Sequence, residues 1–349
     1  MGHALKTMVT GPAAPVNRSS DSEGLLWRLM AKLVTAYVRV RHGKHADGYR
    51  YFIRQHYLSW LFQLRYWWKD RVTRTPHATI AFDGEFSPEL KFVIPYAYWH
   101  HLNGTLLKTI GCAHTRDLYF FSPDHEERYT TRRWNDFHFP LEIPNSEDHN
   151  VRYTYRKWAP VPWKSHFGHG HFTYAKPTLV IANRYNTEWT GEPVSYFGME
   201  DLRALLHLLA DRYQVIYNRP PAAAIVNDES QVMDLNEKDM IRREFPSVLL
   251  LEDLMAHPKA QARNFNHLQL MVYADCERFI SIHGGTATLA SCFGGTNVIY
   301  SRKGHEHYFG EFRSIYPKLS GSMILPCRTM KDVIKEVGNR FVNHPRQAQ

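Results

Sequence analysis

The sequence predicts an α/β protein of two Rossmann-like domains, preceded by a basic, helical N-terminal segment. Short apolar runs alternate with amphipathic helical patterns in the second half of the 349-residue chain, which is typical of parallel, doubly wound sheets. The length exceeds that of an ordinary single domain. All of the excess positive charge lies in one stretch near the N-terminus. We therefore expect a disordered tail (1–23), basic aromatic helices (24–76), a first α/β domain (77–172) and a second one (173–349).

The composition is that of a soluble globular protein, with 44% hydrophobic and 22% charged residues. The four cysteines are widely spaced without a Cys-x-x-Cys pair, so we expect reduced core residues and no disulfide framework. His166, His169 and His171 lack metal-binding spacing and a Cys or carboxylate partner, so we expect no metal site. The chain shows no membrane-spanning apolar run and no signal-peptide pattern. These features predict a cytoplasmic protein, with any membrane association peripheral and on the inner face.

The basic segment, residues 24–76, carries eleven basic and two acidic residues, whereas the 32 basic and 32 acidic residues elsewhere cancel. Two amphipathic helices are predicted, with a turn near residues 43–48. The apolar face of the first comprises Leu25, Leu29, Leu33, Tyr37 and Val40, with Arg28, Lys32 and Arg39 off it; that of the second comprises Phe52, Ile53, Tyr57, Trp60, Leu64 and Trp68. Three interpretations stay open: packing onto the folded body, docking on an anionic membrane, and binding of a nucleic-acid backbone, which is the least favoured.

The first α/β domain is predicted from a strand at residues 78–82 and another at residues 118–121. A polar loop, Asp83-Gly84-Glu85, follows the first of these strands. Residues 122–172 are rich in Pro, His, Trp and charge without a regular period, which favours loops over a cleft between the domains.

The second α/β domain shows polar residues where its predicted strands end. The strands are expected at 178–182, 214–217, 248–251, 279–282 and 297–300, and helices at 199–211 and 266–274. The polar residues that follow them are Arg184 and Asn186, Asn218, Asp253, His283, and then Lys303 and Glu306. Arginine and lysine suit phosphate, and a carboxylate accepts ribose hydroxyls. Each residue alone could equally lie in a surface loop, but together they predict a ligand site at the carboxyl edge of one sheet.

A glycine turn follows the fourth of these strands. Gly284 and Gly285 allow the backbone after His283 to turn tightly and to approach a ligand closely. Thr286 is expected to cap the next helix, whose free N–H groups and positive dipole end favour an anion such as a diphosphate. Residues 294–295 are expected to end that helix. The alternative is that the glycines only punctuate an ordinary turn.

The second domain resembles the donor-binding domain of GT-B-type glycosyltransferases over about residues 177–330. The resemblance is carried by Ile282-His283-Gly284-Gly285-Thr286, by the earlier strand end Leu250-Leu251-Glu252-Asp253, and by Gly304-His305-Glu306. The loop with Arg184 is similar to the phosphate-contacting arginine loop of fucosyltransferase-like members. Those members show His-x-Arg-Arg where this chain has Ile-Ala-Asn-Arg, which argues against GDP-fucose as the donor.

The resemblance implies transfer of a sugar from a nucleotide-diphosphate sugar to a glycan or lipid-linked acceptor in surface polysaccharide synthesis, without a metal or another cofactor. It implies that Arg184, His283 and the helix start at Thr286 stabilise the leaving diphosphate. Inverting transfer also needs a base, for which Asp83 and Glu85 are the candidates, the alternative being a solvated turn. Two other functions stay open: a sugar-nucleotide epimerase or hydrolase on the same scaffold, and a basic nucleic-acid-binding protein.

Overall fold

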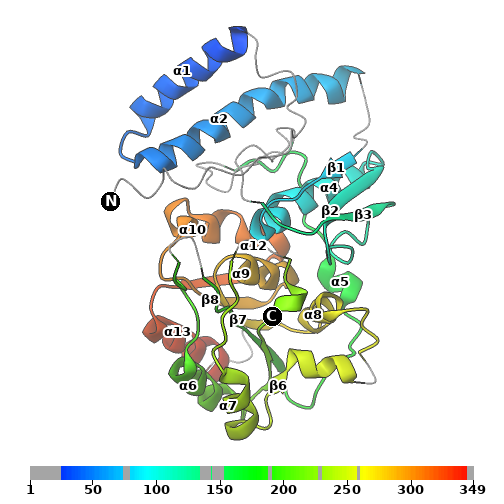
Figure 1. Ribbon diagram of the computed structural model, residues 1–349, viewed down its shortest axis with the longest axis vertical. Helices are drawn as coiled ribbons and strands as arrows, with labels where there is room; N and C mark the ends of the chain where they lie inside the picture. Colours follow the sequence, from blue (N-terminus) through cyan, green and yellow to red (C-terminus); the bar gives the residue numbers. More distant parts are fainter. Residues whose placement is uncertain are drawn as a thin grey trace.

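The computed structural model describes residues 25–73, 79–133, 143, 153–187, 191–226, 230–257 and 260–343. Over these residues the protein is a mixed α/β structure with a three-stranded and a six-stranded sheet, both parallel. The α/β class predicted from the sequence is confirmed. The predicted tail, residues 1–23, lies outside the described part. Figure 1 shows the N-terminal helices at one end of the molecule and the six-stranded sheet toward the other.

The N-terminal helical hairpin consists of α1 (Leu25–Arg41) and α2 (Asp47–Trp68) and ends in a π-helical turn, η2 (Lys69–Thr73). Both helices and the turn between them lie where the sequence predicts them. The Nε2 atom of His42 and the hydroxyl of Tyr57 lie 3.0 Å apart, which ties the end of α1 to the middle of α2. No helix in the described part of the chain is long and apolar enough to cross a lipid bilayer.

The three-stranded sheet has the order β1-β2-β3, with β1 at Thr79–Ala81, β2 at Lys108–Cys112 and β3 at His125–Tyr129. A continuous helical stretch joins the first two strands; it consists of α3 (Phe86–Pro88), the π-helical turn η3 (Glu89–Val93) and α4 (Ile94–Leu102). The strand predicted at residues 78–82 is confirmed by β1. The sheet thus places the loop at residues 83–85 directly after a strand, as expected.

The strand predicted at residues 118–121 is wrong, because these residues form a turn. The backbone N–H groups of Leu118 and Tyr119 both donate to the carbonyl oxygen of Thr115. The apolar side chains of this turn are buried, so their character reflects core packing and not a strand. The strand beside β2 is instead the polar β3, whose Glu126 forms an ion pair with Lys108 at 2.9 Å. Charged edge strands of this kind are missed by a search for apolar runs.

The six-stranded sheet has the order β6-β5-β4-β7-β8-β9. Its strands are β4 (Thr178–Ala182), β5 (Gln214–Asn218), β6 (Leu249–Leu250), β7 (Arg278–Ile282), β8 (Thr296–Tyr300) and β9 (Met323–Cys327). Counted along the chain, these strands run 3-2-1-4-5-6 across the sheet, the order of dinucleotide-binding doubly wound folds. The five predicted strands are all present, although β6 is shorter than expected because a 3₁₀ turn begins at Leu251. The sixth strand, β9, was not predicted.

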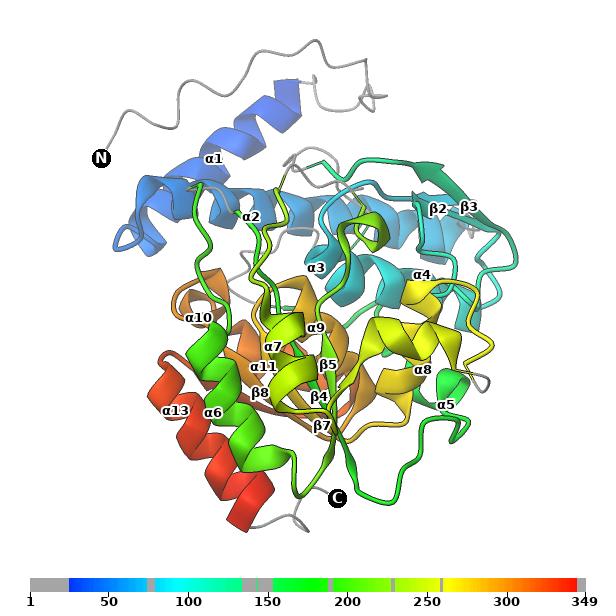
Figure 2. The ribbon, with the colours of Figure 1, turned by 60° about the horizontal axis from the view of Figure 1, so that its bottom comes forward.

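Helices cover both faces of the six-stranded sheet, as Figure 2 shows. The α-helices are α5 (Trp163–Phe167), α6 (Met199–Leu209), α7 (Glu237–Glu244), α8 (Phe265–Ala274), α9 (Gly285–Ala290), α10 (His305–Tyr308), α11 (Glu311–Ser314), α12 (Tyr316–Ser320) and α13 (Met330–Val337). The remaining turns are 3₁₀ at η4 (Ala222–Ala224), η5 (Leu251–Ala256) and η6 (Ser291–Phe293), and π-helical at η7 (Gly338–Asn343). The helices predicted at 199–211 and 266–274 correspond to α6 and α8.

Alternate residues of β4 enter two apolar cores on opposite faces of the sheet. Leu179 and Ile181 pack in a core with residues of α6, α7 and α13, whereas Val180 and Ala182 pack in a core with residues of α8, α9 and α12. Burial on both faces explains why this parallel strand reads as a continuous apolar run. The second core also includes residues of η3 and α4, so the first α/β part of the chain packs directly on the six-stranded sheet.

The segment before β4 differs from the expected loops over a cleft. Its described residues contribute Val161, Trp163, Phe167 and Phe172 to the core that the two parts of the chain share. The indole N–H of Trp163 donates to the carbonyl oxygen of Leu118 at 3.1 Å, which satisfies the polar atom of this buried ring. The aromatic residues that made this segment look irregular are therefore packing residues.

Candidate functional site

The candidate site lies where β4 and β7 are neighbours in the sheet. β5 and β6 extend the sheet beyond β4 on one side, and β8 and β9 extend it beyond β7 on the other. Ligands of open α/β sheets bind beyond the carboxyl ends of the strands at such a reversal of strand order. The residues at this place are Asn183 and Arg184 after β4, and His283 and Gly284 after β7.

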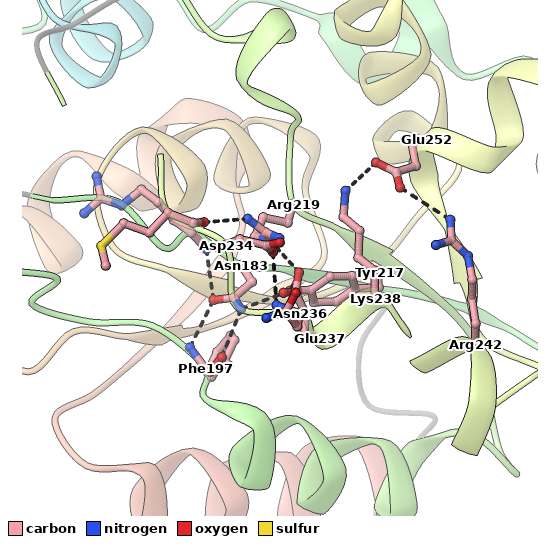
Figure 3. A network of polar contacts seen from close by, with 12 residues as sticks. Asn183, Phe197, Tyr217, Arg219, Asp234, Asn236, Glu237, Lys238, Arg242 and Glu252 are labelled. Carbon is pink, nitrogen blue, oxygen red and sulfur yellow. Dashed lines mark hydrogen bonds and ion pairs between the residues drawn. The ribbon is translucent and has the colours of Figure 1, made fainter. Parts of the chain in front are cut away.

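Asn183 holds the end of β4 in place. Its Oδ1 atom accepts the backbone N–H groups of Arg184 at 2.9 Å and of Phe197 at 3.0 Å, and its amide nitrogen donates to the hydroxyl of Tyr217 at 3.0 Å. The Tyr217 hydroxyl in turn lies 3.0 Å from Glu237, which is buried (Figure 3). Because Asn183 is fully buried and bonded, it orients the backbone from which Arg184 projects.

Gly284 and Arg184 lie against each other across the two strand ends. Gly284 has φ +85°, a conformation that side chains other than glycine rarely adopt, and a Cβ atom added there would lie 3.4 Å from a terminal nitrogen of Arg184. The chain then enters α9 at Gly285, so Gly284 is the N-cap and Thr286 is not, contrary to the sequence prediction. Residues 284–286 are partly exposed.

A group of buried charges lies behind the glycine turn. Lys91 and Glu311 form an ion pair of 2.7 Å with both side chains fully buried, and it joins η3 to α11. Glu306, at the start of α10, is also buried. Burial alone would raise the pKa of Glu306, but the charges of His305, His283 and Lys91 outweigh it and hold that pKa below its ordinary value. The Glu306 carboxyl group is therefore close enough to His283 for the two side chains to interact electrostatically.

The first α/β part of the chain meets the same turn through α3. A Cβ atom added at Gly285 would lie 2.8 Å from the ring of Phe86, so this ring rests on the glycine backbone. The hydroxyls of Ser87 and Thr288 lie 2.9 Å apart and join the first turn of the chain after β1 to α9. Asp83 and Glu85, both partly buried, lie in the loop that leads directly into α3. The charge of Asp83 acts on Cys112 and Tyr129, at the ends of β2 and β3.

Arg132 fixes the loop at residues 83–85. Its guanidinium donates to the carbonyl oxygen of Gly84 at 2.7 Å, forms an ion pair with Glu89 at 2.7 Å, and lies 5.0 Å from the centre of the Phe86 ring. The hydroxyl of Tyr119 donates to the same Glu89 at 2.9 Å. Buried charged residues thus fix the position of the loop. Such supporting contacts keep the residues of a site rigid.

Four predicted donor-binding residues lie in other surroundings. Asn186 is buried, and its amide donates to Ser230 at 3.3 Å. Asn218 is buried under the sheet edge, where its amide donates to the hydroxyl of Tyr273. Asp253 pairs with Arg242 at 3.1 Å on the exposed outer end of the sheet. Lys303 is exposed and, with Arg302 and residues 192–194, lines a surface hollow of about 340 Å³.

The residues that sequence reasoning missed are Lys91, Glu311, Phe86 and the Glu89–Arg132 pair. Lys91 and Glu89 stand in an otherwise apolar helical stretch, and a charge in such a stretch signals a buried partner. A comparable network neutralises Arg219, which follows β5 and pairs with Asp234 at 3.1 Å and with Glu237 (Figure 3). Arg219 therefore serves the fold, whereas Arg184 lies at the turn.

No metal centre accompanies these residues: among those that the structure describes, no group of three His, Cys, Asp or Glu side chains is arranged to hold an ion. His166 stacks on Phe120 with ring centres 3.7 Å apart, which gives it a packing role. Comparisons of the chain with protein-family models, with curated proteins and with solved structures found no match.

Proposed function

We propose that the protein is a glycosyltransferase that takes a sugar from a nucleotide-diphosphate sugar. As in GT-B enzymes, different parts of the chain would bind the donor and the acceptor. The six-stranded part would bind the donor, and the first α/β part would supply the acceptor side. The observation that carries this proposal is the contact of Arg184 with the Gly284 turn at the reversal of strand order. A guanidinium beside the start of a helix at that position suits a diphosphate better than a neutral ligand.

The leaving diphosphate would be held by Arg184, by the N–H groups of Gly285 and Thr286, and by His283. These donors are fixed by the sheet before any ligand arrives, so they need little reorganisation as negative charge develops. Glu306 is only 3% exposed, which suits a positioning role toward His283 better than the ribose contact expected from the sequence.

In the transfer step, the acceptor hydroxyl oxygen bonds to the anomeric carbon while the bond from that carbon to the diphosphate oxygen breaks. The hydroxyl proton passes to a carboxylate, and the electron pair of the broken bond stays on the diphosphate. Asp83 or Glu85 would accept the proton, because their loop leads directly into α3, which contacts the turn that carries the donor groups. The sheet edge and the loop after β1 would therefore face the two sides of the anomeric carbon.

The proposal is tested by titrating the full chain with UDP, GDP, ADP and inorganic phosphate in a calorimeter. We expect one nucleoside diphosphate to bind more tightly than phosphate alone, because both base and diphosphate contact the site. The corresponding sugar nucleotide is then incubated with and without glycan and lipid-linked acceptors. Release of free sugar in the absence of an acceptor would favour a hydrolase, and failure of every nucleotide to bind would overturn the proposal.

A further inference from the structure

Helix α1 carries a second apolar face that the protein body does not cover. Its inner face packs on α2 and includes Val38, which is 2% exposed. The outer face consists of Leu25, Leu29, Leu33, Tyr37 and Val40, which are 76%, 51%, 71%, 50% and 87% exposed. Tyr37 lies at its border, where one side of the ring packs edge-on against Tyr57 of α2 with centres 5.3 Å apart. Four of the five are large aliphatic side chains, which exceeds the scattered apolar exposure that soluble surfaces normally show.

These five residues form one continuous stripe, which we call the outer stripe. Successive members are three or four positions apart, so they lie above one another along a single side of the helix. The exposed side chains of Arg28, Lys32 and Arg39 follow one border of the stripe. Residues 25–73 as a whole contain ten basic and two acidic residues, a net charge of +8. An apolar stripe with a cationic border is the pattern of helices that lie in a membrane interface.

The hairpin is attached to the rest of the protein so that the outer stripe stays turned away from it. The ring of Tyr49 stacks on Tyr308 with centres 4.7 Å apart, and His45 packs on Tyr308 and Phe309. At the far end of α2, Asp70 forms an ion pair with Lys157. Both views show α1 on the side of α2 that is farther from the sheets (Figures 1 and 2). The stripe is thus presented by a hairpin that is held at both ends.

We propose that the outer stripe of α1 docks on the surface of an anionic lipid bilayer. The leucines, Tyr37 and Val40 enter the boundary between headgroups and acyl chains, and the bordering cations contact lipid phosphates. A second copy of the chain fits less well, because a symmetric contact would bring two strongly positive hairpins together. A nucleic acid would use the cations but would leave the leucines in water. This docking does not depend on the proposed transferase activity.

The contacts between the hairpin and α10 also relate membrane docking to the candidate site. Tyr308, which the hairpin contacts, is in the same short helix, α10, as Glu306. A membrane-bound hairpin would therefore hold the α10 side of the candidate site near the bilayer surface, where a lipid-linked acceptor is found. This consequence, unlike the docking itself, rests on the proposed function.

The experiment is co-sedimentation of the full chain with two kinds of vesicle, one of phosphatidylcholine and one of equal parts phosphatidylcholine and phosphatidylglycerol. We expect binding to the anionic vesicles and little to the neutral ones. The variant Leu29→Asp/Leu33→Asp should have an affinity for the anionic vesicles that is lower by about tenfold or more, because charge replaces apolar side chains at the interface. Its control is Leu102→Asp/Leu107→Asp, which changes two leucines that are 59% and 58% exposed outside the hairpin and should bind as the wild type does.

A second pair of variants tests the cations. Arg28→Glu/Lys32→Glu should reduce binding to anionic vesicles by about tenfold or more, whereas Lys331→Glu/Lys335→Glu, which reverses two exposed charges on α13, should not. Thermal melting of every variant checks that it is folded. Docking on a bilayer is overturned if the wild type ignores anionic vesicles or if the stripe variant binds like the wild type. Two other results would overturn it if the wild type binds no vesicles. In the first, the stripe substitutions dissociate a dimer, and in the second, the charge substitutions abolish RNA binding.

Discussion

Arg184 and Gly284 are 100 positions apart in the sequence, yet the guanidinium of the first lies against the backbone of the second at the centre of the six-stranded sheet. The contact exists because β4 and β7 are adjacent parallel strands whose carboxyl ends meet at one edge. It combines a cation with a backbone that a Cβ atom would obstruct. A cation beside a glycine backbone is a combination that suits an anion.

The contact makes a direct prediction for nucleotide binding. Replacement of Arg184 by alanine should weaken the affinity for the preferred nucleoside diphosphate by about tenfold to a hundredfold, because a charge-assisted hydrogen bond is lost. The matched control is Arg212→Ala, an exposed arginine at the opposite edge of the sheet, just before β5. Calorimetric titration of both variants checks the prediction. Equal affinities in the two variants would show that Arg184 does not contact the diphosphate.

The packing of Phe86 on Gly285 gives a prediction for stability. Gly285→Ala should lower the free energy of unfolding by about 1–3 kcal/mol, because the added Cβ atom presses on the Phe86 ring. Phe86→Ala removes that obstacle, so the double variant Gly285→Ala/Phe86→Ala should be more stable than the sum of the two single effects predicts. Urea unfolding of the three variants measures the coupling. Strict additivity would mean that the two residues do not touch in solution.

The sequence predicts the second half of the fold well because burial on both faces makes its strands unbroken apolar runs. For this reason the predicted bounds of β4 and β7 agree with the observed bounds to within one residue. Each strand is also followed by a polar residue, which located Arg184 and His283. The polar β3 gave no such signal, since its charges pair across the exposed edge.

Tertiary packing decides the parts of the site that the sequence does not reveal. Lys91 and Glu311 pair across 220 positions, and no local pattern connects them. Asn186 and Asp253 follow strands just as Arg184 does, but nearby partners, Ser230 and Arg242, engage their side chains. A polar residue after a strand therefore marks a candidate, and the course of the next loop decides whether it faces the ligand.

The Lys91–Glu311 pair is expected to hold the first α/β part of the chain to the six-stranded part. Lys91→Met should cost about 3–5 kcal/mol of unfolding free energy, because it leaves the Glu311 carboxylate buried without its main partner. The variant Lys91→Met/Glu311→Gln removes both charges and should recover a large share of that loss. Denaturant unfolding compares the two. A single variant that costs no more than the double one would contradict a buried ion pair.

The pH dependence of stability should contain a contribution from His125 on β3. Burial lowers the pKa of His125 to about 4, the charge of Arg116 adds to that effect, and Glu127 and Asp124 oppose it. Above its unfolded pKa of about 6.5 the residue is neutral in both states. As the pH falls from about 6.5 toward 4, the unfolded chain binds a proton that the folded protein refuses, so stability is lost.

The loss from His125 should amount to about 1–2 kcal/mol after allowance for solvent screening. It is measured as the difference in unfolding free energy between wild type and His125→Gln at about pH 7.5 and about pH 5, the range in which the residue titrates. That difference should shrink at the lower pH, since glutamine does not titrate. A gap that stays constant for His125→Gln would rule out the depressed pKa.

The two carboxylates after β1 carry the last prediction. Asp83→Asn or Glu85→Gln should lower the rate of sugar transfer by about a hundredfold to ten-thousandfold, because the acceptor hydroxyl loses its general base. Binding of the nucleoside diphosphate should stay unchanged, since in this proposal neither residue contacts the diphosphate. The control is Asp211→Asn, an exposed carboxylate at the far end of α6. If both loop variants transfer sugar at the wild-type rate, the base lies elsewhere; if they instead weaken nucleotide binding, the loop belongs to the donor side of the site.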